Sequence, residues 1–346
     1  MKAVVLLAPN EYVYQDVEKP QCPEEGILLN VKYCGLCGSD LRTLRSGHKN
    51  IQFPAVLGHE ISGIVAEIGP SYNGDFKPGE ALCVGPNVYC GTCEFCVRGE
   101  LEFCENLREL AQHWPGGFAE YIAIPREALD NGVIRRIPDG VRMEHVAVGE
   151  PPSSCINAQE KLNVHDGDSL LIIGAGPIGA IHVSVARARG AATIYVADIA
   201  ASRLEMVKDF GVDAVIDSSK TDLIEEIMKL TGGKGVDVVI TANPVAVTQV
   251  QAIEVARKAG RIAFFGGLPH ADCNVTLDTN KIHYRGLHVI GTTGFAPRHY
   301  DESIRYIAKG LIPAEKLVTH VLPLKDFAEG VELARAGQAM KVVFEI

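Results

Sequence analysis

The sequence has no apolar run of the about 20 residues that a membrane-spanning helix needs, and its first residues lack the long apolar segment of a signal peptide. We therefore expect a cytoplasmic protein without a membrane partner. Positive charge is scarce, because 33 Lys and Arg stand against 43 Asp and Glu, for a formal charge of −10. That balance argues against a nucleic-acid or anionic-lipid surface. Internal repeats and low-complexity segments are also absent.

Ten cysteines are present, and four of them fall within 15 residues, at Cys90, Cys93, Cys96 and Cys104. In a cytosolic chain this spacing favours a metal over disulfides, although disulfides or free thiols are the alternative. Zinc prefers four such ligands in a tetrahedron, and Gly91 and Gly99 would help the loop to wrap around it. Because no ligand position is left open, the loop predicts a structural zinc site.

A glycine-rich turn joins a strand to a helix in the middle of the chain. The apolar run Ser169–Ile173 stops at Gly174-Ala175-Gly176-Pro177-Ile178-Gly179, and a helical pattern and a second apolar run follow. This order is typical of a dinucleotide-binding unit. Gly174 would allow a tight turn, Gly176 the approach of a pyrophosphate, and Gly179 close packing of helix on strand. The free N–H groups of the helix N-terminus would hold the phosphates.

An acid follows the second of these strands. Asp198 lies 22 residues after Gly176, where it can accept both ribose hydroxyls of an adenosine. A carboxylate there would repel a 2′-phosphate, so we expect NAD rather than NADP. Arg203 could stack on the adenine, or it could be a solvated helix residue.

Length and pattern predict two domains in an α/β chain of 346 residues. Residues 1–152 alternate short apolar runs with turn clusters, which suggests a β-barrel-like domain. Residues 153–294 alternate six strands with helices, as in a doubly wound Rossmann sheet. We expect residues 295–346 to rejoin the first domain. The expected strands of the second domain are 170–173, 194–197, 214–216, 236–241, 261–265 and 288–291, and its expected helices are 181–189, 203–210, 221–230 and 247–259.

A second set of metal-ligand residues is dispersed along the first domain. Cys37 lies in a glycine-rich turn, His59-Glu60 follows Gly58, and Glu150 stands at the domain boundary. Thiolate, imidazole and carboxylate all bind zinc, and three of them leave a position for water or substrate. Each residue also has a simpler interpretation, as a small core residue, a hydrogen-bonded turn residue or a solvated acid.

Together these motifs resemble one family along essentially the whole chain. CGLCGSD, LGHE, the four-cysteine loop, GEPP, GAGPIG and the segment Val318–Val321 occur in the order and spacing of zinc-dependent medium-chain alcohol/polyol dehydrogenases. Within the family, the chain resembles the branch of sorbitol (L-iditol) and threonine dehydrogenases. The resemblance implies a GroES-like catalytic domain, a Rossmann NAD-binding domain, one catalytic and one structural zinc ion, and an active site in the cleft between the domains.

Carried over to this sequence, the family pattern makes Cys37, His59 and Glu60 ligands of the catalytic zinc. Glu150 matches a glutamate of the polyol branch that binds the metal or its water. Ser39 matches the hydroxyl that passes the proton of the alcohol onward, and Asp40 would orient His59. The resemblance also assigns cofactor contacts to a further set of residues: Pro177, Ile178, Gly266, Leu268 and Thr292.

Two residues depart from the family pattern. Arg42 stands where a histidine often relays the proton to solvent, and arginine stays protonated and cannot act as a base. Arg42 could bind a phosphate or carboxylate of the substrate, or it could pair with a nearby acid. Thr43 replaces the tyrosine that sorbitol dehydrogenases carry near the substrate.

The resemblance implies reversible oxidation of a secondary alcohol of a polyol to a ketone, with zinc as Lewis acid and NAD as hydride acceptor. The alternatives within enzymes are L-threonine and a phosphorylated polyol such as galactitol phosphate. A non-catalytic zinc- and nucleotide-binding protein is disfavoured, because Cys37, His59 and Glu60 are all present. We also expect a homodimer or homotetramer.

Overall fold

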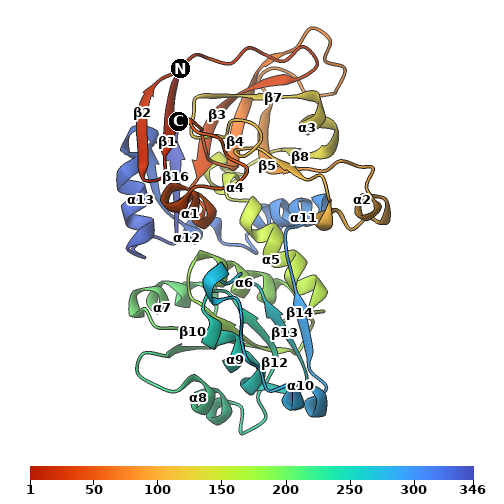
Figure 1. Cartoon of the computed structure of the whole chain (residues 1–346), viewed down its shortest axis with the longest axis vertical. Helices are drawn as coiled ribbons and strands as arrows, with labels where there is room; N and C mark the ends of the chain where they lie inside the picture. The colour runs from red at the N-terminus through yellow and green to blue at the C-terminus, as the bar shows by residue number, and fades with distance from the viewer. The chain divides into compact units, whose positions relative to one another are not determined.

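The computed structural model describes residues 1–346 and groups them into two units (Figure 1). The first unit comprises residues 1–153, 295–310 and 317–346, and the second comprises 154–294 and 311–316. The predicted division placed all of 295–346 in the first domain. Leu311–Lys316 groups instead with the second unit, where Lys316 Nζ donates a hydrogen bond to the backbone oxygen of Asp209 at 2.9 Å.

The first unit is built on an eight-stranded sheet in the order β15-β16-β3-β4-β5-β6. One edge of β3 is shared, because Ile27–Asn30 pairs with β7 and Tyr33–Gly35 pairs with β16. β8 joins β5 in the same way, and β1 and β2 form a separate hairpin. The strands are β1 (Lys2–Ala8), β2 (Glu11–Asp16), β3 (Ile27–Gly35), β4 (Glu60–Ile68), β5 (Ala81–Val88), β6 (Arg108–Glu109), β7 (Tyr121–Ile124), β8 (Gly132–Arg136), β15 (Val318–Pro323) and β16 (Lys341–Glu345).

Short helices connect these strands, and one of them changes the expected setting of the metal site. The glycine-rich turn after Cys37 is in fact the start of helix α1, whose first turn contains Asp40. None of the helices of the protein is both long and apolar enough to cross a bilayer. The helices that begin in this unit are α1 (Gly38–Ser46), α2 (Glu94–Arg98), α3 (Arg126–Asn131), α4 (Met143–Ala147), α5 (Glu150–Lys161), α11 (Pro297–Ala308) and α13 (Phe327–Arg335).

The second unit is a six-stranded parallel sheet in the order β11-β10-β9-β12-β13-β14. In chain order this is 3-2-1-4-5-6, the order of a doubly wound nucleotide-binding sheet. Helices α6 to α10 flank its strands (Figure 1). The strands are β9 (Ser169–Ile173), β10 (Thr193–Asp198), β11 (Ala214–Asp217), β12 (Val236–Thr241), β13 (Ala256–Phe264) and β14 (His288–Gly291).

The helices of the second unit are α6 (Pro177–Ala188), α7 (Ala201–Val207), α8 (Leu223–Leu230), α9 (Ala246–Val255) and α10 (Thr279–Arg285), and α12 (Ala314–Leu317) precedes β15. Two of the predicted helices had a boundary that was wrong by four residues. Helix α6 begins directly after Gly176 rather than at Ile181, because Pro177 suits the first helical position. The predicted helix 247–259 ends at Val255, since Ala259 has a left-handed φ of 60° and the chain from Ala256 joins the sheet.

His182 is a buried histidine of α6 that gives the second unit an acid-sensitive core. Its Nδ1 lies 3.2 Å from Gln159 Nε2 and its Nε2 has no partner. The centroid of its ring lies 4.6 Å from that of Phe265 in a T-shaped arrangement. Burial lowers the pKa of His182 from 6.5 to about 3. The unfolded chain therefore binds a proton at this residue between these two pH values while the folded chain does not. Stability attributable to His182 is present above pH 6.5 and falls as the pH drops below it.

We expect His182→Gln, which keeps an acceptor for Gln159, to lose less stability than the native protein as the pH falls. Between pH 7 and pH 5 the native protein should lose about 2 kcal/mol more than the variant in urea unfolding. The exposed His270 of the same unit supplies the control, since His270→Gln removes a histidine without touching the buried one. If the unfolding free energies of the native protein and of His182→Gln changed with pH in parallel, His182 would not be the source of the pH dependence.

Candidate metal centres and nucleotide-binding turn

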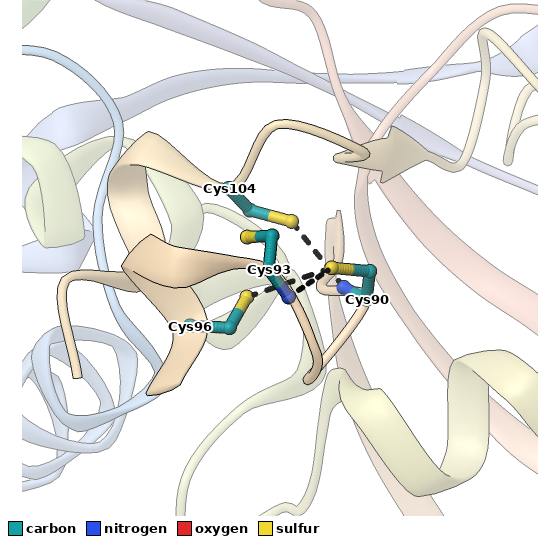
Figure 2. Close-up of side chains that lie close together, drawn as sticks. All are labelled: Cys90, Cys93, Cys96 and Cys104. Carbon is teal, nitrogen blue, oxygen red and sulfur yellow. Dashed lines mark hydrogen bonds between the residues drawn. The ribbon is translucent and has the colours of Figure 1, made fainter. Parts of the chain in front are cut away.

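The four cysteines of the loop after β5 converge on one point (Figure 2). Cys93 precedes α2, Cys96 lies within it, and Cys104 follows a short 3₁₀ turn. The four sulfur atoms lie within 4.8 Å of one another. Gly91 and Gly99 have left-handed φ values of 70° and 81°, so the loop needs glycine at both bends.

Hydrogen bonds prepare the loop for a cation. The backbone N–H of Cys93 donates to Cys90 Sγ at 3.4 Å, and the amide of Asn106 approaches the same sulfur at 3.8 Å. Backbone N–H groups of Thr92 and Cys93 lower the pKa of Cys90 to about 5, whereas burial raises the pKa of Cys96 to about 12. Four sulfur donors fill the tetrahedron of a zinc ion, so this site fits a structural zinc with no open position.

Cys37, His59 and Glu60 form the second group of candidate ligands. Cys37 precedes α1 just after the end of β3, and Glu60 begins β4. The antiparallel register pairs Glu60 with Gly35, which brings the two segments together. One ligand atom from each of the three residues lies within 4.8 Å of the others.

Asp40 organises this group. Its Oδ2 accepts a hydrogen bond from the backbone N–H of Cys37 at 2.9 Å, and its Oδ1 lies 3.4 Å from His59 Nδ1. His59 Nε2 is therefore the nitrogen left for a metal. Burial lowers the pKa of His59, but Asp40 and Cys37 raise it by more, so the net shift favours the protonated ring. Zinc binding would release that proton.

Glu60 is fully buried, and its two oxygens have different surroundings. Oε1 forms an ion pair with Lys341, which comes from β16, whereas Oε2 has no hydrogen-bond partner. A Cβ at Gly35 would stand 2.1 Å from Oε2, so glycine is needed to admit the carboxylate. A buried oxygen without a partner beside a thiol and an imidazole fits zinc with one open position. The sequence carried no signal for Gly35 or Lys341.

Glu150 is the first residue of α5 and is not part of the group of mutually close ligand atoms. It lines a cavity of about 230 Å³ together with Cys37, Ser39 and His59. Burial raises the pKa of Glu150 to about 7. This position suits a contact with a water molecule or a substrate better than direct ligation.

The glycine turn after β9 has the geometry that its sequence suggested. Gly174 has a φ of 121°, and a Cβ there would lie 2.8 Å from the carbonyl oxygen of Ala242. A Cβ at Gly179 would lie 1.9 Å from the carbonyl oxygen of Gly174. A Cβ at Gly176 would meet no protein atom within 4 Å, so the space beside this residue is open at the N-terminus of α6. That space is free for a phosphate group.

Asp198 ends β10, and its carboxylate also holds the turn. Oδ2 accepts a hydrogen bond from Ala175 N–H at 2.7 Å, and Oδ1 accepts one from Ala200 N–H at 2.9 Å. The sequence had not indicated this backbone role. Arg203 lies in the first turn of α7 and is half-buried.

The other predicted cofactor contacts lie near the ends of β13 and β14. Gly266 donates a hydrogen bond to the carbonyl of Thr241 at 2.8 Å, and a Cβ there would lie 2.2 Å from the carbonyl oxygen of Asn243. Thr292 Oγ1 is buried without a partner, and Thr292 lines a cavity of about 170 Å³. Leu268 is half-buried in the loop that follows Gly266.

Two metal-ligand groups and a doubly wound sheet with a glycine turn define a zinc- and dinucleotide-binding class of oxidoreductase. Comparison with known proteins agrees. Residues 23–134 match the alcohol dehydrogenase GroES-like domain, and residues 177–309 match the zinc-binding dehydrogenase family. The predicted GroES-like and Rossmann folds are thereby confirmed.

Relatives match along the whole chain. A D-arabitol-phosphate dehydrogenase of Enterococcus avium is 30% identical over 100% of this chain and 97% of its own length. An L-threonine 3-dehydrogenase of Bacillus velezensis is 33% identical over 99% and 98%, and a sorbitol dehydrogenase of Bacillus subtilis is 32% identical over 96% and 94%. The structure of a zinc-binding dehydrogenase from Sinorhizobium meliloti bound to NADP has a TM-score of 0.92 at 30% identity, covering 100% of this chain and 99% of that one.

The chain therefore belongs to the zinc-dependent medium-chain alcohol/polyol dehydrogenase family. It is an oxidoreductase that acts on CH–OH groups, as the sequence resemblance implied.

Proposed function

We propose that this protein catalyses the reversible oxidation of a secondary alcohol of a polyol, or of a polyol derivative, to the ketone with NAD. The observation that carries the proposal is that Glu60 Oε2 has no hydrogen-bond partner and lies beside Cys37 and His59. Cys37 and His59 line a cavity together with Ser39 and Glu150. The sorbitol and D-arabitol-phosphate dehydrogenases among the relatives support a polyol.

Cys37, His59 and Glu60 would hold the catalytic zinc, and zinc and NAD when bound supply Lewis-acid activation of the alcohol and a hydride acceptor. Ser39 is exposed to the cavity and to solvent, so its hydroxyl can accept the proton of the alcohol and pass it directly to water. This route needs no base at position 42. Glu150 would hold a water molecule or a substrate hydroxyl, and Asp40 keeps His59 in its ligating orientation.

NAD is our proposed cofactor although the Sinorhizobium meliloti structure holds NADP. The support is Asp198, because its carboxylate stands at the end of β10, where a 2′-phosphate would meet a like charge. Pro177, Ile178, Arg203, Leu268 and Thr292 remain proposed cofactor contacts.

We further propose a cytoplasmic homodimer or homotetramer. Thiolate zinc ligands require reduced cysteines, which supports a reducing compartment, and all ten cysteines are free. The exposed edge strand β14, with Val289 37% exposed, supports pairing of two sheets across a subunit boundary.

The test is reduction of NAD and of NADP over a panel of polyols, phosphorylated polyols, simple alcohols and L-threonine. We expect turnover of a polyol class with NAD at least about tenfold more efficient than with NADP, because a charge clash costs more than 1.4 kcal/mol. Light scattering on the same preparation should give a dimer or tetramer. No turnover of any polyol by zinc-loaded protein would refute the proposed substrate class.

A further inference from the structure

The cavity beside the candidate catalytic metal site contains a cation that the proposed mechanism does not use. Arg42 and His48 line this cavity together with Cys37, Ser39 and His59. Arg42 is exposed and forms no ion pair or hydrogen bond with the protein. The alternative that a nearby acid neutralises this arginine is therefore not realised in the structure.

The helix places Arg42 next to the expected site of reaction. Ser39 and Arg42 are three residues apart in α1, so their side chains lie on the same face in successive turns. Asp40 and Thr43 are buried and line the same cavity. Arg42 therefore lies one helical turn beyond the residue whose hydroxyl would take the proton of the alcohol.

The sequence segment around Arg42 is rich in basic residues. Residues 41–52, LRTLRSGHKNIQ, contain four basic side chains and no acid, in a chain of formal charge −10. In the same stretch the backbone N–H of Asn50 lies 3.4 Å from His48 Nδ1, which places the ring proton on Nε2 and makes it a donor. A guanidinium with a second donor nearby is the arrangement that binds a phosphate or carboxylate.

Acceptors stand elsewhere in the same cavity. Glu109 and Glu150 both line it, and the hydroxyls of a polyol can donate to carboxylates. The cavity therefore offers acceptors for hydroxyl groups and a separate cation for an anionic group. A neutral polyol would leave Arg42 unused, whereas a phosphate monoester would occupy both kinds of group.

We propose that Arg42, assisted by His48, binds a terminal phosphate of the substrate, so that the preferred substrate is a phosphorylated sugar alcohol. This inference rests on the proposed function and specifies its substrate. Arg42 thus takes the position of a proton-relay histidine with a different task, the selection of charged substrates.

The test compares matched pairs, D-arabitol with D-arabitol phosphate and sorbitol with sorbitol phosphate, in the zinc-loaded protein with NAD. We expect the native protein to prefer the phosphorylated member. Arg42→Ala should reduce the ratio of the two kcat/KM values by about 10- to 100-fold, the effect of losing a hydrogen bond to a charged group. Arg42→Lys should restore part of the ratio, because lysine keeps the charge but not the bidentate fork.

Arg45 gives a matched control, since it lies on the same helix and is exposed; it shares a neighbouring surface pocket with Arg42 but does not line the cavity that contains Ser39. Arg45→Ala should change the ratio by less than about twofold, as expected for a screened surface charge. Calorimetric titration of the zinc-loaded protein with D-arabitol phosphate, without NAD, tests binding apart from turnover. It should show weaker binding in Arg42→Ala than in Arg45→Ala.

Three results would overturn the inference. The first is equal turnover of the neutral and the phosphorylated member of each pair. The second is an Arg42→Ala variant that lowers kcat/KM equally for both members and also changes the KM for NAD. The third is a preference for L-threonine, whose carboxylate would then be the anion at Arg42. Oxidation of neutral polyols with a ratio insensitive to Arg42 would leave the proposed function standing. Arg42-dependent binding of D-arabitol phosphate without oxidation of any polyol would support the anion site and refute the proposed function.

Discussion

Cys37→Ala is expected to lower kcat by at least about a thousandfold and to reduce the zinc content from two ions to one per chain. The thiolate is one of three candidate ligands, and a Lewis acid contributes several kcal/mol to such a reaction, where each 1.36 kcal/mol is a factor of ten. The fold should survive, because Asp40 accepts its hydrogen bond from the backbone of Cys37 and Glu60 keeps its ion pair with Lys341. The measurements are zinc per chain by mass spectrometry, the rate of NADH formation and the thermal midpoint.

Cys22→Ala is the control, since Cys22 is a half-buried free cysteine outside both metal-ligand groups. It should keep two zinc ions and the native rate. Full activity in Cys37→Ala, or the loss of both zinc ions at once, would contradict the division of the ligands into two independent sites.

Cys104→Ser should have the converse effect: it should lower the stability of the fold while the catalytic activity of the folded protein is retained. The thiol of Cys104 accepts a hydrogen bond from the backbone N–H of Cys90 at 3.3 Å, and its sulfur lies within 4.8 Å of the other three. Zinc binding to such sites supplies about 10–16 kcal/mol in isolated peptides. We expect at least about 3 kcal/mol of destabilisation, which lowers the thermal midpoint by roughly 6–12 °C.

The two sets of ligands share no residue, so Cys104→Ser should retain turnover at temperatures where it is folded. Cys273→Ser, at an exposed cysteine, controls for the substitution itself. We expect Cys104→Ser to contain one zinc ion fewer per chain and to melt at a lower temperature than the native protein. An unchanged melting temperature in Cys104→Ser would mean that the loop holds no structural metal.

Local patterns in the sequence were enough to predict the four-cysteine loop and the glycine turn. Each is contained in a short segment, and the backbone of Gly91, Gly99 and Gly174 adopts the left-handed φ values that glycine permits. The parallel sheet was also predictable, because buried strands and crossover helices alternate at regular intervals. The helix Gly38–Ser46 was missed, since its glycine-rich start resembles a turn.

Contacts between distant segments could not be predicted. Lys341 meets Glu60 across 281 residues, and a single lysine near the end of a chain has no pattern that indicates burial. The end of α9 at Val255 was hidden for a similar reason, because the pairing of β13 with β12 outweighs the helical pattern that continues to Ala259. The sequence likewise could not show that Arg42 has no ion-pair partner, because this depends on which acidic side chains the fold brings near it.

The ion pair between Glu60 and Lys341 makes strand β16 part of the metal site. Lys341 enters through β16, the last strand, which pairs with β3 just before Cys37. A chain that lost only this strand would retain Cys37, His59 and Glu60 but would leave a buried carboxylate without its cation, at a cost of about 3–5 kcal/mol. Truncation before Lys341 would therefore impair the metal centre without removing any of its ligands.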